Sequence, residues 1–144
     1  MTLARIYIPL NASGLRNLDT DHVVRGAPFI AHAVTDAVRA AAPTAGEDGW
    51  EYAAMSDAVL RSAELLTSGE TRRIVAAADV APELVRPAAQ GDSGDFIDDS
   101  TVWVLDSVAL KRIASFHVDG DEASEDDELQ WYDVTELPVI LALL

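Results

Sequence analysis

The stretch Ala33-Val34-Thr35-Asp36-Ala37-Val38 returns 21 residues later as Ala54-Met55-Ser56-Asp57-Ala58-Val59. Each copy follows a run led by an aromatic residue and precedes an alanine-rich stretch. An apolar run that ends in Thr or Ser is typical of a strand followed by a capped helix, because the hydroxyl accepts a hydrogen bond from a free N–H of the first turn. The Asp beside the hydroxyl faces the positive end of the helix dipole. The repeat therefore predicts strand–helix units, with strands at 29–34 and 50–55.

The same alternation continues along the chain. Further strands are expected at 5–10, 72–80, 101–105, 115–118 and 129–134, and further helices at 11–21, 106–113 and 135–144. Hydroxyl residues close four of the strands at a helix start, namely Thr35, Ser56, Ser107 and Thr135. We therefore expect one α/β domain over residues 1–144, a layered sandwich with a mixed β-sheet flanked by helices.

Charge is the most unusual property of the composition. The chain has 144 residues and a formal charge of −15, with 25 acidic against 10 basic residues. Such a field repels phosphates, so we predict no nucleic-acid partner. We interpret the charge first as a solvated acidic surface; a basic protein partner and mimicry of nucleic acid are the alternative hypotheses. The longest apolar run, 138–144, is far shorter than the ~20 residues that span a bilayer, so no membrane association is expected. The chain has no cysteine, which excludes disulfides and thiolate sites. Residues 1–10 do not resemble a secretory signal, and we expect a cytoplasmic protein.

Two acidic stretches, 86–100 and 119–128, are predicted to be mobile loops. The second stretch invites a calcium interpretation, but its only glycine, Gly120, does not have the spacing of an EF-hand loop. Asp95, Asp98 and Asp99 form an acidic cluster in the first stretch. We interpret both as solvated loops.

Several short segments occur in an order that is similar to a known family. They are Arg5–Leu10, His32–Thr35, Glu51–Ala54, Arg72–Val80, His117–Asp119, Glu128–Tyr132 and Glu136–Leu137. Together they resemble a small family of actinobacterial proteins known only as a domain of unknown function, over residues 5 to 140. The resemblance implies a cytoplasmic bacterial protein that is a stand-alone domain, and it supplies no catalytic residues. The chain departs from the family pattern at Gln130, Val134 and Thr135.

Two strand histidines carry the catalytic hypothesis. His32 and His117, with Asp119 as the nearby carboxylate, could serve a small hydrolase or phosphoesterase as general acid and base. Such enzymes repeat His-x-Thr or His-x-Ser, whereas the third positions here are Val34 and Asp119. The histidines could instead join Asp36 or Asp119 as ligands of Zn or Mn. We interpret both as structural and predict no cofactor. Asp36 and Asp57 are interpreted as cap neighbours, and Arg72 and Arg73 as partners of nearby carboxylates.

The C-terminal end is apolar nearly all round and must be covered by the domain or by a second subunit. Trp131 and Tyr132, just before it, are residue types favoured at interfaces. The candidate interface residues are Trp131, Tyr132, Leu137, Val139, Ile140 and Leu143. Because no complete catalytic set is found, the leading hypothesis is a non-catalytic interaction or regulatory module, with homodimerisation through this end.

Overall fold

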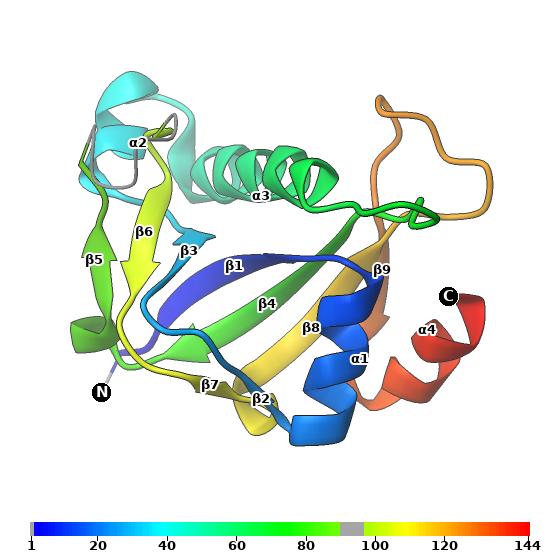
Figure 1. Cartoon of the computed structure of the whole chain (residues 1–144). Coiled ribbons are helices and arrows are strands. Elements are labelled where there is room, and N and C mark those ends of the chain that lie inside the picture. The colour runs from blue at the N-terminus through cyan, green and yellow to red at the C-terminus, as the bar shows by residue number, and fades with distance from the viewer. Residues whose placement is uncertain (1, 90–96) are drawn as a thin grey trace.

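Seven strands pair into one sheet in the computed structural model, which describes residues 2–89 and 97–144. In chain order these strands are β1 (Ala4–Leu10), β3 (Phe29–His32), β4 (Ile74–Val80), β5 (Val85–Pro87), β6 (Thr101–Val104), β8 (Ile113–Val118) and β9 (Gln130–Asp133). Their order across the sheet is β5-β6-β3-β1-β4-β8-β9. Two short strands, β2 (Val23–Val24) and β7 (Val108–Ala109), form a separate pair (Figure 1).

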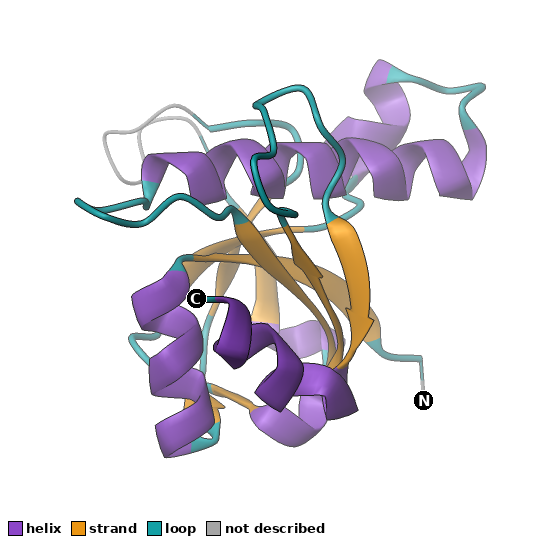
Figure 2. Ribbon diagram, turned by 90° about the vertical axis from the view of Figure 1, so that its right-hand side faces the viewer, coloured by secondary structure: helices purple, strands orange, loops and turns teal. Residues whose placement is uncertain are grey.

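Helices cover both faces of the sheet. The longest, α3 (Gly46–Glu64), lies across one face, while α1 (Ala12–Asp21) and α4 (Leu137–Leu143) lie on the other (Figure 2). The short helix α2 (Asp36–Ala41) precedes α3. Side chains alternate along a strand, so each face of the sheet has its own apolar cluster.

The larger apolar cluster joins the sheet to α1 and α4. Its fully buried members include Ile6, Phe116, Leu15 and Ile140. The smaller cluster joins the sheet to α3, through Tyr7, Val75, Ala77, Ala54 and Ala58. The small side chains on both sides let α3 approach the sheet closely. The predicted two-sided burial of the run at 72–80 is confirmed, since β4 lies inside the sheet and only Asp79 of its seven residues is not buried.

The strand predicted at 50–55 is wrong, because these residues lie inside α3. Ser56 is consequently no helix cap. The helix begins at Gly46, with Glu47 and Asp48 in its first turn, where acidic residues are favourable. Its buried residues Ala54, Ala58 and Ser62 follow the helical spacing of four. That spacing across 54–62 was the signal against a strand.

The four predicted caps have different outcomes. Thr35 is confirmed as the cap of α2, since its hydroxyl accepts a hydrogen bond from Val38 N at 3.1 Å. No α-helix begins at Ser107: the chain forms β7 and then a short 3-10 turn, Leu110–Arg112. At the last junction the cap is Asp133 rather than Thr135, and it opens a second turn, Val134–Glu136, ahead of α4. A third 3-10 turn, Pro82–Leu84, precedes β5.

The expected single-domain α/β class is confirmed, whereas every strand pairing among the described residues is antiparallel rather than mixed. Parallel neighbours need a crossover connection, and α2 and α3 form such a connection between β3 and β4. These two strands are not neighbours, however, because β1 lies between them and pairs antiparallel with both. No helix in the described ranges combines the length and the hydropathy that a bilayer crossing requires.

Candidate functional site

The acidic segment, residues 119–128, is held against the sheet by one arginine. Arg73 is 6% exposed, and its guanidinium binds both carboxylate oxygens of Asp119 at 2.7 and 2.8 Å. The same guanidinium donates to the carbonyl oxygens of Ser124, Glu125 and Asp127 at 2.9 to 3.1 Å. The ion pair raises the pKa of Arg73 through its hydrogen bonds to Asp119. This arrangement gives the acidic segment a defined path beside the sheet.

The neighbouring arginine adds to the same attachment. Arg72 donates to the carbonyl oxygen of Asp119 at 2.8 Å and forms an ion pair with Asp121. The expectation that both arginines pair with nearby carboxylates is confirmed. The predicted mobility of 119–128 stays a prediction, and the other predicted mobile stretch, 86–100, lies partly outside the described residues, at 90–96.

A cavity of about 550 Å³, here called the α3 cleft, lies between α3 and the acidic segment. The side chains that α3 contributes recur at 48, 51, 52, 55, 56, 59 and 60, which is one continuous helical stripe. The apolar lining is Tyr7, Tyr52, Met55, Val59, Leu60 and Leu129. The acidic lining is Asp48, Glu51, Glu125, Asp126, Asp127 and Glu128.

The charge of the α3 cleft is strongly negative. Arg73 also lines the cleft, but its charge is matched by Asp119 behind it. Burial, followed by the charge of Glu51, raises the pKa of Tyr7 to about 12, so its phenol stays neutral. Burial also lowers the pKa of His117, so its ring is neutral at pH 7. The cleft therefore combines an apolar floor, two neutral polar rings and an acidic rim, which suits an apolar ligand that carries positive charge.

The structure does not bring His32 and His117 together. His32 lies on β3 opposite Tyr7 of β1, which is opposite Ala77 of β4, which is opposite Ser115 of β8. Three spacings of about 4.8 Å put β3 and β8 roughly 14 Å apart. A general acid and base that share one scissile bond must lie closer than this.

Asp119 is also unsuited to the catalytic hypothesis. Its carboxylate is 5% exposed, and both oxygens are bound by Arg73. His117 instead bonds the hydroxyl of Ser115 at 3.1 Å. Asp36, at the start of α2, pairs with Arg39 on the same helix. The proposed acid–base set therefore does not assemble as a unit.

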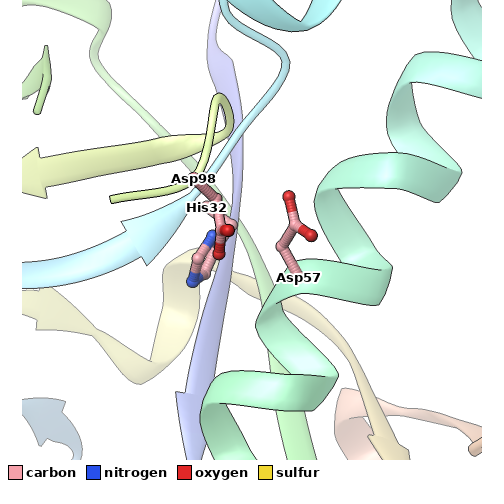
Figure 3. A group of neighbouring side chains, drawn as sticks. All are labelled: His32, Asp57 and Asp98. Atoms are coloured by element: carbon pink, nitrogen blue, oxygen red, sulfur yellow. The ribbon is translucent and has the colours of Figure 1, made fainter. Parts of the chain in front are cut away.

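A second polar group, here called the His32 cluster, lies on the other side of α3. It consists of His32, Asp57, Asp98 and Ser100, which come from β3, α3 and the segment before β6 (Figure 3 shows the first three). His32 Nδ1 and Ser100 Oγ are 2.9 Å apart, and Ser100 Oγ donates to Asp57 Oδ2 at 2.7 Å. Burial, with a smaller effect from the charge of Arg61, lowers the pKa of His32 to about 4.

The sequence does not predict the His32 cluster. It identifies His32 as a candidate but indicates a cap neighbour at Asp57 and a solvated loop at Asp98, and nothing in the spacing of these two acids joins them to His32. The α3 stripe could have been found, because Tyr52, Met55 and Val59 recur at helical intervals once 50–55 is read as helix.

The candidate interface residues at the C-terminal end divide into two groups. Leu137 and Ile140 are buried in the larger apolar cluster. Trp131, Val139 and Leu143 are 61%, 53% and 38% exposed. Tyr132 is half-buried and packs against the same cluster. The domain therefore covers one side of α4 and leaves the other in contact with solvent.

Comparison with known proteins places the chain in a family. No curated protein and no solved structure matched the chain. A family model described as a family of unknown function, DUF6912, matches residues 4–126, which include both the α3 stripe and the His32 cluster. The chain belongs to this family.

Proposed function

We propose that this protein is a non-catalytic interaction module that holds a basic, amphipathic segment of a partner protein in the α3 cleft. The observation that carries the proposal is the pairing of an apolar floor with six carboxylates on the rim, where the guanidinium of Arg73 is already neutralised by Asp119. The overall charge of −15 extends the same field and favours encounter with a cationic partner.

The chemistry of the cleft defines the segment it accepts. Tyr52 and Leu60 are each 63% exposed on α3 and flank the floor, so apolar side chains can reach it without displacing the core. Lys or Arg side chains on either side would meet Glu51 on α3 and Glu125 on the acidic segment. An amphipathic helix or an extended segment with alternating basic and apolar residues satisfies this pattern.

The experiment is a display selection. A random 16-residue peptide library is selected against the wild-type protein, and the proposal expects sequences rich in Lys and Arg that alternate with apolar residues. Leu60→Asp and the double variant Glu51→Gln/Glu125→Gln are expected to weaken a selected peptide by about tenfold or more, as loss of an apolar contact or of two rim charges implies. Selected sequences without basic residues would contradict the proposal.

Matched control variants distinguish peptide binding in the α3 cleft from binding to the acidic surface as a whole. Leu105 is 45% exposed and lies away from the cleft lining, so Leu105→Asp is the control for Leu60→Asp. Glu83→Gln, in the turn before β5, is the control for the rim variants. Both controls are expected to bind the selected peptide as the wild type does.

We also propose that two copies associate through the β9 edge of the sheet. β9 ends the strand order, and in the described part of the chain no strand pairs with its outer side. Trp131 on β9 and Val139 on α4 supply exposed apolar surface near that edge. Light scattering coupled to size exclusion is expected to give twice the chain mass, and a monomer at all concentrations would contradict this.

The cellular setting is part of the same proposal. An actinobacterial, cytoplasmic protein is what the resemblance implies, and the absence of cysteine and a basic content of nine arginines to one lysine agree with it. Fractionation of a cell that expresses the protein tests this setting, and recovery of the protein outside the cytoplasm would contradict it.

A further inference from the structure

Three side chains with metal-binding atoms meet beside α3, outside the α3 cleft. They are His32, the last residue of β3, Asp57 in the middle of α3, and Asp98 before β6. One ligand atom from each lies within 4.8 Å of the other two. Figure 3 shows that the imidazole and the two carboxylates come from separate elements, with Asp57 on α3 beside His32 and Asp98. We propose that His32, Asp57 and Asp98 bind a divalent transition-metal ion, Zn²⁺ or Mn²⁺.

The donor set fits these ions. One imidazole nitrogen and two carboxylates suit Zn²⁺ and Mn²⁺ better than the all-oxygen sites that Ca²⁺ and Mg²⁺ prefer.

Only one of the two ring nitrogens of His32 has a hydrogen-bond partner among the described residues. Ser100 Oγ donates its hydrogen to Asp57, so the hydrogen between His32 Nδ1 and Ser100 belongs to the ring. The other ring nitrogen, Nε2, is buried and has no hydrogen-bond partner among the described residues. A buried imidazole that is neutral and half-satisfied is costly unless something else binds it. Ser100 also supplies the kind of hydrogen bond that orients a ligating carboxylate.

The carboxylates carry an excess of negative charge. One oxygen of Asp57 and one of Asp98 lie within 4.8 Å of each other. The charged groups nearby are Arg61, Asp99 and Glu64. Arg61 also pairs with Glu64, and one guanidinium does not balance these acids. A divalent ion would remove the imbalance.

The cluster is open to solvent on one side. Asp57 and Asp98 line a cavity of about 430 Å³, whose lining also includes Ala42 and Trp50. An ion can enter along this cavity, and water can occupy the coordination positions that three protein ligands leave free.

The test uses the full chain after treatment with a chelator. Isothermal titration with Zn²⁺ or Mn²⁺ is expected to show one site per chain and tighter binding than with Mg²⁺ or Ca²⁺. Asp57→Asn and Asp98→Asn are each expected to weaken binding by at least about tenfold. His22→Gln is the matched control, because His22 is exposed at the end of α1, and it is expected to bind as the wild type does.

A measurement on the wild type keeps the proposal testable if a variant does not fold. Added Mn²⁺ is expected to broaden the amide NMR signals of residues 31–33, 56–58 and 98–101 first. Zn²⁺ is expected to shift the imidazole ¹⁵N signals of His32. The proposal would be overturned if neither Zn²⁺ nor Mn²⁺ bound at one site per chain. It would also be overturned if Mn²⁺ broadened only the signals of the acidic segment at 119–128.

Discussion

The two buried polar groups on the α3 side of the sheet differ in how completely their charges are matched. Arg73 and Asp119 are both nearly buried, and the side-chain nitrogens of Arg73 make five hydrogen bonds to protein oxygens. The His32 cluster has two carboxylates and one neutral imidazole, and no described residue bonds the Nε2 nitrogen of that ring. The first group has its charges matched by protein groups, whereas the second is the group for which we propose a ligand.

This difference indicates a structural role for the Arg73–Asp119 pair and a ligand-binding role for the His32 cluster. A buried ion pair whose hydrogen bonds are all made fixes geometry, and here it fixes the acidic wall of the α3 cleft. A buried group with unmatched charge reduces the free energy of unfolding and persists where a ligand compensates it. The following predictions test each half of this comparison.

The largest effect is expected from Arg73→Met. The change leaves the Asp119 carboxylate buried without a counter-charge, which costs about 3–5 kcal/mol of unfolding free energy. Urea denaturation at pH 7 measures the loss. A loss below about 1 kcal/mol, the value typical of an exposed pair, would show that the pair is not what holds the acidic segment.

A pH effect of similar size is expected from His32. Its pKa is about 4 in the folded protein, against a usual value of about 6.5, so the unfolded chain binds the proton more readily between these two pH values. The contribution of His32 to stability is therefore present above pH 6.5 and is lost as the pH falls toward 4, by about 3 kcal/mol.

Comparison of the wild type with His32→Gln isolates this effect. Asp57 and Asp98 titrate nearby with raised pKa values, and they remain in both proteins. The difference in unfolding free energy between the two proteins is expected to change between pH 7 and pH 4. A constant difference would mean that His32 does not titrate in this way.

A smaller effect is expected from Arg73→Lys. Lysine keeps the charge beside Asp119 but loses the planar fork that reaches the carbonyl oxygens of Ser124, Glu125 and Asp127. Amide hydrogen exchange at 119–128 is expected to become about tenfold faster, equal to ~1.4 kcal/mol of local opening. Unchanged exchange at 119–128 would mean that the Arg73 guanidinium does not restrain the acidic segment. That result would agree with the prediction that this segment is a mobile loop.

The smallest effect is expected from Arg5→Gln. Arg5 binds Asp79 through two hydrogen bonds of 2.7 and 2.9 Å, but the side chains are 43% and 34% exposed. An exposed pair contributes about 0–1 kcal/mol, and salt screens it. The same urea measurement, at low and high salt, gives the comparison with Arg73. A loss as large as that of Arg73→Met would remove the distinction between buried and exposed pairs.

The sequence predicted the fold class better than its local elements. The strands at 5–10 and 72–80 were predictable because their apolar runs are long and bounded. The repeat at 33–38 and 54–59 misled, because similar residues cap a helix in one copy and lie inside a helix in the other. Helical spacing over 48–62 was the stronger signal.

The candidate sites were less predictable. His32, Asp57 and Asp98 are separated by 25 and 41 residues, and only the fold joins them. The pairing of Arg73 with an acid was predictable from the strong excess of carboxylates. Its choice of Asp119 depends on the pairing of β4 with β8, which places the start of one strand beside the end of the other.

Salt dependence of peptide affinity tests the central claim, that the α3 cleft binds a basic segment, most directly. The dissociation constant of a selected peptide is measured between 50 and 500 mM NaCl, roughly the range over which the Debye length falls from above 10 Å to below 5 Å. The account predicts steep weakening for the wild type and a clearly shallower slope for Glu51→Gln/Glu125→Gln. Equal slopes for the two proteins would place the bound peptide elsewhere and contradict the account.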